Sequence, residues 1–537
     1  MPDESQVVRG IDYRSTFPFT LIFKSFRVAI HPSKLVLALM ALLALYVGGR
    51  VLDGIWSANS LAVPNEMALY DSSRTEADPG RVFIDQRDAT RAAVVENYRG
   101  RLRAINKPDG NLNDIKWAII DRRDKVAHRA IDDFAQNKPS NPEDLARATR
   151  DRDETIAAIF AEASADWQNI RAVKGVGLFR TFFDYELGTA QRIITNVFSN
   201  RWIGVGGVLD ESVNFLTTAP SWGFHYHTVY FVVYGIYFLF IWAIFGGAIA
   251  RIAAVQVARD EKISFRQALS FSTAKFLSFV SAPIIPLLII VFVGLVVAIG
   301  GAFGNIPFLG PILVGIFFFL ALAAGFIMTL VLLGLVGGYN LMYPTIAVEG
   351  SDSFDAISRS FSYLYARPWR LMFYTFVALI YGALCYVFVR FFIRMLLSLT
   401  HHFAGMFLIV HADNVAPLWS AMWNDPLGAV HLTYNVDYLT LTTGQAIGAF
   451  FLWLWVHLAI AMLGAFAISF YFSANTIIYV LMRHEVDATE LDDVYIEQMD
   501  EDFGEAAAPA DAPPISAATP PVEPMIPPGE TPPTESV

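Results

Sequence analysis

The sequence predicts an all-α, polytopic helical membrane bundle of about six transmembrane helices. Two observations predict this class. The 537-residue chain is 55% hydrophobic and 14% aromatic but only 17% charged, which is a larger apolar excess than an ordinary soluble domain carries. That excess is also uneven, because apolar runs occupy 35–49 and most of 229–469, whereas 57–222 and the residues after Arg483 are typical of water-soluble chain. The chain is therefore expected to fold partly in a bilayer and partly in water.

Five segments follow from this distribution. We expect a cytoplasmic N-terminal and interfacial segment (1–34), a transmembrane anchor (35–56), an extracytoplasmic helical domain (57–226), a five-span membrane bundle with an internal repeat (227–482) and an acidic, Pro- and Ala-rich disordered tail (483–537). The first apolar run begins only at Leu35, behind several basic residues, and is expected to be an uncleaved anchor and not a secretory signal.

The six predicted spans are each close to the roughly 20 residues that a helix needs to cross a bilayer. They are 35–55, 229–249, 279–299, 312–335, 371–392 and 446–469. The third contains Pro283 and Pro286, which remove backbone donors and should kink or break the helix. Because a bilayer tolerates such a break only where neighbouring helices cover it, this span is expected in the interior of the bundle.

Orientation is predicted from Lys and Arg near the span ends. Basic residues gather before the first span, between spans two and three, and between spans four and five, whereas the loop 301–310 has no charge. We therefore expect a multi-pass protein of the cytoplasmic membrane with both termini in the cytoplasm.

The polar segment 57–226 is predicted to be helical. Asn141, Pro142 and Glu143 form a cap followed by proline at the first helical position, which should open a helix through about Ile170. Residues 114–134 and 88–105 also have helical spacing. A spacer or protein-contact domain is the favoured interpretation, and ligand binding is the alternative.

Two links between spans resemble each other, which predicts an internal repeat of span, elbow helix and span. In the first link, Ser264 and Gln267 form a capping box. In the second, Phe354, Ile357, Phe361 and Leu364 give one apolar helix face before Pro368. A duplicated scaffold and a transporter with its site between the repeats both fit this pattern.

The stretch VEGSDSFDAISRSF (348–361), with ARPW (366–369) and TIIYVLMR (476–483), resembles uncharacterised multi-pass membrane proteins of planctomycete-type bacteria, from Phe23 to about Ile496. Spans two to six are more distantly similar to the membrane domain appended to some glycerophosphodiester phosphodiesterases. The His-Arg-Gly opening of that family's catalytic domain is absent, since His128 and Arg129 are followed by Ala130. The resemblance therefore implies a membrane fold without the enzymatic activity.

Seven charged residues near the elbows are candidate lipid or partner contacts: Arg251, Arg259, Glu349, Asp352, Asp355, Arg359 and Arg367. They could bind anionic headgroups. The alternative, which we favour, is that they cap helices, pair with each other and anchor orientation.

No catalytic, metal-binding or cofactor-binding motif is found, so no cofactor is predicted. Histidines 225, 227, 401, 402, 411 and 431 are expected on the outer face, where an interfacial location is favoured over metal binding. His457, within the sixth span, is expected to be packed and hydrogen-bonded. Cys385 is the only cysteine and excludes an internal disulfide.

The leading prediction is a non-enzymatic membrane protein that organises lipid or protein partners in the cell envelope. Membrane lipids are the first partner class, and protein partners could bind the outer domain and the acidic tail. Nucleic acid is not expected, because no basic stripe interleaved with aromatic residues occurs. The alternative is a transporter or permease component for a small or lipidic substrate.

Overall fold

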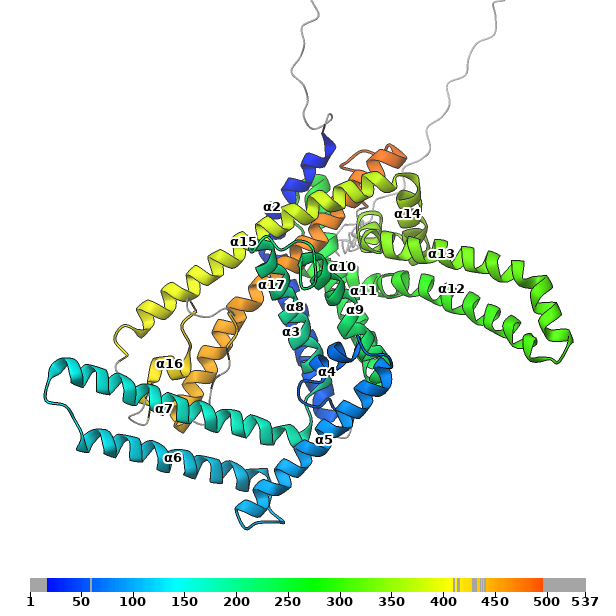
Figure 1. The fold of residues 1–537 in the computed structure, drawn as a ribbon. Helices are drawn as coiled ribbons and strands as arrows, with labels where there is room; N and C mark the ends of the chain where they lie inside the picture. Colours follow the sequence, from blue (N-terminus) through cyan, green and yellow to red (C-terminus); the bar gives the residue numbers. More distant parts are fainter. Residues whose placement is uncertain are drawn as a thin grey trace, which may run out of the picture. The chain divides into compact units, whose positions relative to one another are not determined.

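The computed structural model describes residues 17–57, 60–408, 411–412, 416–426, 432–434, 436, 438 and 441–495. Within them the chain is all-α apart from one antiparallel pair of two-residue strands, β1 (His411–Ala412) and β2 (Ala416–Pro417) (Figure 1). The predicted fold class is confirmed.

Six helices in the described part are long and apolar enough to cross a membrane. They are α3 (Pro32–Ile55), α10 (Thr228–Arg259), α12 (Phe276–Ala302), α13 (Leu309–Glu349), α15 (Pro368–Gly405) and α17 (Thr443–Asp487). Each contains one predicted span. The chain is thus built as an integral membrane protein.

Several of these helices are longer than their predicted spans. α13 has 41 residues and α17 has 45, which correspond to roughly 60 and 70 Å at about 1.5 Å per residue. A hydrocarbon core of about 30 Å cannot contain either helix, so each must extend beyond it. In both helices the predicted span covers the N-terminal part, and the remaining C-terminal turns are stabilised by packing on other helices.

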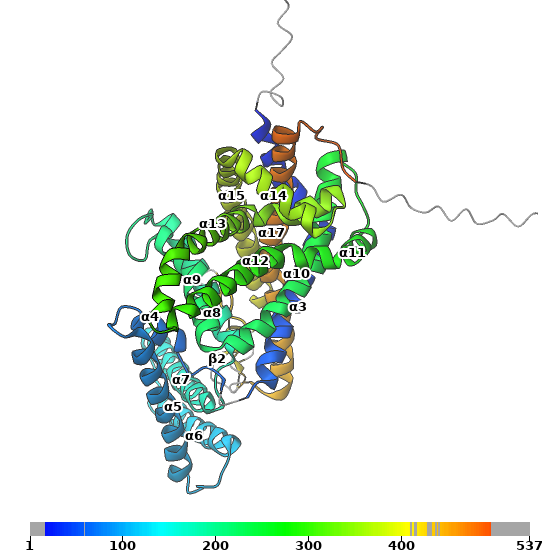
Figure 2. The same ribbon diagram turned by 90° about the vertical axis from the view of Figure 1, so that its right-hand side faces the viewer.

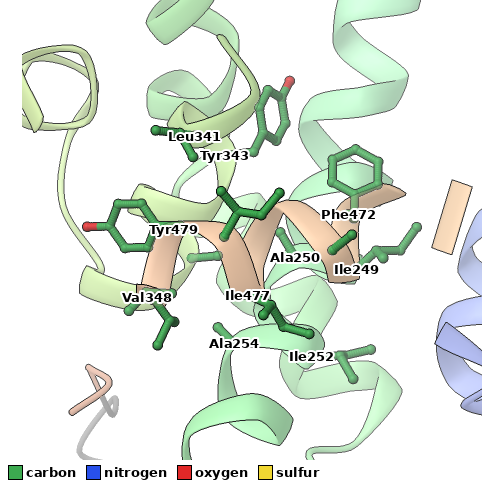
Figure 3. Packing of buried hydrophobic residues seen from close by; sticks show 14 of the residues in the cluster. Ile249, Ala250, Ile252, Ala254, Leu341, Tyr343, Val348, Phe472, Ile477 and Tyr479 are labelled. Carbon is green, nitrogen blue, oxygen red and sulfur yellow. The ribbon is translucent and has the colours of Figure 1, made fainter. Parts of the chain in front are cut away.

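The main core lies where α3, α10, α13 and α17 meet, and Figure 3 shows Ile249, Ala250, Leu341 and Ile477 packed there. Close approach depends on small residues. A Cβ on Gly247 would lie 2.5 Å from the Ser272 hydroxyl and 2.7 Å from the Phe279 ring, so no larger residue fits without a shift. η1 (Pro18–Lys24) and α2 (Ser25–Ala29) pack on the same core through Ile22 and Ala29.

α12 and α13 run side by side, joined by η4 (Phe303–Asn305) (Figure 1). The expectation that α12 is interior holds only near its start, where Phe279, Ala282 and Pro286 are buried. From Leu287 onward its large apolar side chains are mostly exposed, so that expectation is corrected for the rest of the helix. The two prolines lie inside a continuous helix. Apolar side chains with no protein neighbour are suited to lipid contact.

Two short elbow helices follow α10 and α13, as predicted. α11 (Phe265–Ala274) begins with the expected capping box of Ser264 and Gln267, and α14 (Ser353–Ala366) is capped by Asp352. The buried face of α14 is Ser353, Ala356, Ser360 and Tyr363, with Ile357, Phe361 and Leu364 beside it. Phe354, the first residue of the predicted apolar face, is 69% exposed, whereas the other three residues of that face pack on the core. In both places a long helix is followed by an elbow helix and then by another long helix. That this order comes from an internal repeat stays a prediction.

We call the end of the bundle that carries α11, α14 and the last turns of α17 the elbow end. Residues 483–487, expected in the tail, belong to α17, and the following residues pack back on this end. The side chain of Val494 is buried, and the Tyr495 N–H donates to the Val348 carbonyl at 2.8 Å. The expected tail boundary at 483 is therefore corrected to about 495, and the rest of the predicted tail lies outside the described residues.

The polar segment is helical, as predicted. It contains α4 (Glu66–Ser73), α5 (Pro79–Ala104), α6 (Leu112–Gln136), α7 (Pro142–Arg171), η3 (Ala172–Lys174), α8 (Leu178–Phe198) and α9 (Val208–Tyr226). Asn141 caps α7 with Pro142 at its first position, as expected. We call α5, α6 and α7 the polar arm (Figure 2), and α8 with α9 the α8–α9 hairpin.

The polar segment is not a domain separate from the bundle. Its aromatic core joins Phe83, Phe179 and Trp222 to Tyr230 and Phe231 at the start of α10. α9 ends at Tyr226 and α10 begins at Thr228, so only His227 separates them. At the predicted boundary, residue 226, the sequence changes from polar to apolar, but the packing continues across it. The last short helix, α16 (Leu418–Met422), packs near the start of α17.

Candidate functional site

The seven predicted contact residues lie on α10 and α13 and on or directly beside α14, but they do not form one site. Glu349, Asp355 and Arg359 come together in an ion-pair cluster. α13 ends at Glu349 because Gly350 adopts the left-handed conformation, with φ of 63°, which suits a glycine at this position. Asp352 then accepts the Asp355 N–H at 2.9 Å and opens α14. This short turn places the first turns of α14 next to the end of α13.

Arg359 is held by three carboxylates. Its Nε lies 2.8 Å from Glu349 Oε2 and 3.1 Å from Asp355 Oδ1, one helical turn earlier. Its Nη1 lies 3.6 Å from Asp487 Oδ2, at the end of α17. The guanidinium therefore joins three helices and is already neutralised by protein groups.

α17 supplies the rest of the cluster. Tyr479 donates a hydrogen bond to Glu349, and Tyr363 of α14 donates one to Asp487. Arg483 Nε lies 3.3 Å from Glu349 Oε1 without a well-aligned hydrogen bond, and its Nη2 lies 2.6 Å from Asp493. Burial raises the pKa of Tyr363 to about 12, so its hydroxyl stays a donor at neutral pH.

Sequence reasoning missed the α17 members because it placed Arg483 at the start of the tail. The continuing helical pattern through 476–483 was the available signal. A second pair lies nearby, where Arg370 binds Glu485 and the Tyr374 hydroxyl donates to the same carboxylate at 3.0 Å. Together these contacts fix α13, α14, α15 and α17 to one another at the elbow end, as the favoured structural interpretation predicts for the paired residues.

Arg251 lies outside the ion-pair cluster and makes a different set of contacts. It is buried, donates from Nη1 to the Ala347 carbonyl at 2.8 Å, and lies over the Phe271 ring at 4.4 Å from its centroid. It therefore joins α10, α11 and α13. Arg259 and Arg367 are exposed at the ends of α10 and α14, and the described residues offer neither of them an ion-pair partner. These two are the predicted contacts that remain accessible to an anionic ligand.

The structure describes the side chains of four of the six histidines that were expected on the outer face. In the described part of the chain, no group of three or more His, Cys, Asp or Glu side chains could hold a metal ion. His227 Nε2 lies 3.1 Å from Glu66 Oε1, whereas His225 is exposed. The side chain of His411 and all of His431 lie outside the described residues. His457 Nδ1 contacts the Trp453 carbonyl at 2.9 Å and its ring stacks on Trp453, which confirms the expected packed role.

Glu66, Asp53 and Lys34 are among the buried ionisable residues that sequence reasoning did not single out. Glu66 accepts the Trp222 indole N–H at 3.2 Å as well as contacting His227. Asp53, at the end of α3, accepts the backbone N–H groups of Phe179 and Arg180. Both are ordinary acidic residues in sequence, and only tertiary packing reveals their partners.

Lys34 is the third. Its side chain is fully buried near the start of α3, where Nζ lies 3.0 Å from Gln256 Oε1 of α10 and 3.3 Å from Ser473 Oγ of α17. No carboxylate among the described residues pairs with it. Lys34 is one of the basic residues that precede the predicted anchor, where it was expected to flank the bilayer. Lys34 lies at the junction of three membrane-spanning helices, in the first turn of α3.

No protein-family model, no curated protein and no solved structure matches this chain. The resemblance drawn from 348–361 and 476–483 therefore stays a prediction, and the function has to be argued from the geometry of this chain.

Proposed function

We propose that this integral membrane protein is a scaffold that presents a rigid polar arm to a protein partner in the cell envelope. The observation that carries the proposal is Trp117, which is 67% exposed on α6 although the other exposed residues around it are polar. Exposed tryptophans rimmed by charge are frequent anchors of protein interfaces. The Lys125–Asp121 pair, at 2.7 Å, lies one to two turns beyond it.

Contacts among α5, α6 and α7 make the polar arm rigid. α6 packs on α7 through a narrow apolar seam that includes Ile115, Ile119 and Ala163. Arg123 lies 4.4 Å from the centroid of the Phe160 ring, and Arg101 Nη2 lies 2.6 Å from Asp166 Oδ1. These contacts use one face of each helix and leave the charged faces exposed. An extended pair of helices with one exposed aromatic residue suits docking better than enclosure of a small substrate.

The test is a photo-crosslinking residue placed at Asp121, one turn from Trp117, in the full chain in its own cells. We expect one discrete protein adduct, which Trp117→Ala should weaken at least tenfold, because loss of a central aromatic anchor costs about 2 kcal/mol or more. The same probe at Arg122, on another face of α6, is the matched control. An adduct pattern that does not depend on Trp117 would contradict the scaffold proposal.

The proposed orientation places the polar arm outside and the elbow end in the cytoplasm, supported by the distribution of basic residues near the spans. Reporter fusions near Ala130 and Asn305 should report an outside location, and those near Glu261 and Ser353 an inside location. A cytoplasmic signal at Ala130 would reverse the proposed orientation of the bundle.

A transport role is the second candidate, and Lys34 is the observation that favours it. Ionisable residues buried between membrane helices are rare and often belong to an ion or substrate pathway. Gln256 and Ser473 give it neutral acceptors only, so the site could exchange a proton or an anion. The scaffold proposal is preferred because a single polar junction does not make a path across the bilayer.

A further inference from the structure

The α8–α9 hairpin has an exposed apolar surface that no described part of the chain covers. Leu209, Val213 and Leu216 follow one another at intervals of four and three residues on α9 and are all exposed, Leu216 by 72%. This spacing places them on one helix face. At the tip of the hairpin, Ile203 is 84% and Val205 is 95% exposed. An apolar surface of this kind is unfavourable in water and promotes aggregation, so we expect it to be covered by a partner or by lipid.

The hairpin begins at membrane depth. The ring centroids of Phe179 and Phe183 lie 5.8 and 5.9 Å from that of Tyr46, which is nine residues before the end of α3. At about 1.5 Å per residue, this is roughly 14 Å inside the end of a spanning helix. Phe179 also lies 5.4 Å from Tyr234, six residues or roughly 9 Å into α10. Half of a hydrocarbon core is about 15 Å, so these contacts fall within one leaflet.

The other face of α9 is already occupied. Ala219 and Trp222 are buried, and the Trp222 ring packs on Phe231 of α10 at 5.7 Å between centroids. Gly223 also packs against Phe231, since a Cβ on Gly223 would lie 2.8 Å from the Phe231 ring. The exposed stripe is therefore on the side of α9 that faces away from the spanning helices. At that depth the medium beside the bundle is lipid.

Several polar groups of the hairpin are paired within it, which lowers their cost in a lipid environment. Arg192 Nε lies 3.0 Å from Glu211 Oε1 across the two helices. In the turn, Asp210 accepts the Gly206 N–H at 2.7 Å, and Asn196 donates to the Gly206 carbonyl at 2.7 Å. Gly204 and Gly206 have φ of 103° and 70°, which permit the tight turn. Arg201 is exposed beside the tip and long enough to reach headgroups.

We propose that the α8–α9 hairpin lies within the bilayer leaflet next to α3 and α10. Ile203, Val205 and the α9 stripe of Leu209, Val213 and Leu216 contact acyl chains, while Arg201 reaches toward phosphate groups. The hairpin is an interfacial element that does not cross the membrane. The occupant of the apolar surface is lipid, because the hairpin packs on two spanning helices, on α3 through Phe179 and Phe183 and on α10 through Trp222.

The experiment measures the depth of nitroxide labels in the full chain, purified into phosphatidylcholine nanodiscs. Cys385→Ala removes the native thiol, and single cysteines are introduced by Val205→Cys, Val126→Cys and Val291→Cys. Val126 is an exposed valine of the polar arm and Val291 an exposed valine of α12, so the three positions match in residue type. Power saturation compares collisions with oxygen, which concentrates in lipid, with collisions with a water-soluble nickel chelate.

We expect the label at 205 to resemble that at 291, with high oxygen access and at least several-fold less nickel access than the label at 126. A label at 205 that is as accessible to nickel as that at 126 would place the tip in water and overturn the proposal. Shielding from both reagents would show a covering protein or a second copy, and would also overturn it. Leu216→Cys repeats the test on α9, and each variant must unfold at the temperature of the Cys385→Ala parent.

Discussion

The carboxylate of Asp53 accepts the backbone N–H of Phe179 at 2.9 Å, although the two residues are 126 positions apart. It also accepts the Arg180 N–H at 3.2 Å and the Tyr230 hydroxyl at 2.7 Å. The first spanning helix therefore supplies the N-terminal cap of α8 and a hydrogen bond to α10. One buried carboxylate fixes the hairpin, the anchor and the second span.

Replacement of Asp53 by Ala should detach the start of α8. Three donors would lose their acceptor in a buried site, so we expect the free energy of unfolding to fall by about 1–3 kcal/mol. Proteolysis in mild detergent should cut the loop 199–207 faster. Asp184→Ala, which removes an exposed carboxylate of α8 paired at 3.4 Å, is the control and should change stability by less than about 0.5 kcal/mol. Equal effects of the two substitutions would argue against the capping role.

Glu349→Gln should destabilise the elbow end, because it removes the carboxylate that binds both Arg359 and Arg483. We expect a loss of about 1–3 kcal/mol in the unfolding free energy. A double-mutant cycle with Arg359→Gln should give a coupling of about 1 kcal/mol. Glu261→Gln, at an exposed position between α10 and α11, is the control. Additive effects of Glu349→Gln and Arg359→Gln would show that the pair does not act as a unit.

Arg367→Gln should weaken anionic lipid binding, whereas Arg359→Gln should not. Arg367 is exposed without an ion-pair partner in the described part of the chain, and Arg359 is occupied by three carboxylates. An exposed basic residue near an anionic surface contributes about 1 kcal/mol, and this contribution is screened by salt. The measurement is retained phosphatidylglycerol at low and high salt. If Arg359→Gln alone lowers retention while stability is unchanged, the ion-pair interpretation of Arg359 is incorrect.

Glu186 should make stability depend on pH. Burial raises the pKa of its carboxyl to about 7, from an ordinary value of 4.5, and its oxygens have no hydrogen-bond partner among the described residues. The folded state then keeps a proton that the unfolded state releases between these values, so stability is greatest at low pH and falls as the pH rises through 7. Glu186→Gln should remove this dependence and raise the unfolding temperature at pH 8 but not at pH 5.

The control for Glu186 is Asp184→Asn, an exposed carboxylate on the same helix, which should leave the pH profile of unfolding unchanged. A Glu186→Gln variant with the parent's pH profile would mean that this carboxyl ionises normally in the folded protein.

Lys34→Met should show whether Lys34 is needed for stability or for transport. The lysine receives only two neutral acceptors in a fully buried site, and a buried charge without a counter-ion is costly. We therefore expect the unfolding free energy to be unchanged or higher, while any transport activity is lost. Lys24→Met, at an exposed position in η1, is the control. A strong loss of stability in Lys34→Met alone would assign the lysine a structural role.

Local signals in the sequence determined the elements of this protein. Apolar runs located all six spanning helices, because about 20 residues must cross the hydrocarbon whatever surrounds them. Asn141 with Pro142, and Ser264 with Gln267, located helix starts, because a cap satisfies backbone donors only a few residues away. These interactions lie within one turn of the chain, so they can be predicted without a fold.

Tertiary structure decided which charged residues have partners. Arg359 and Arg367 are alike in sequence, yet one is held by Glu349, Asp355 and Asp487 and the other is exposed. Lys34, which the sequence placed at the membrane surface, is buried between α3, α10 and α17. Whether an ionisable group meets water, lipid or a counter-charge depends on helices far apart in the chain, and its desolvation is fixed only when those helices pack.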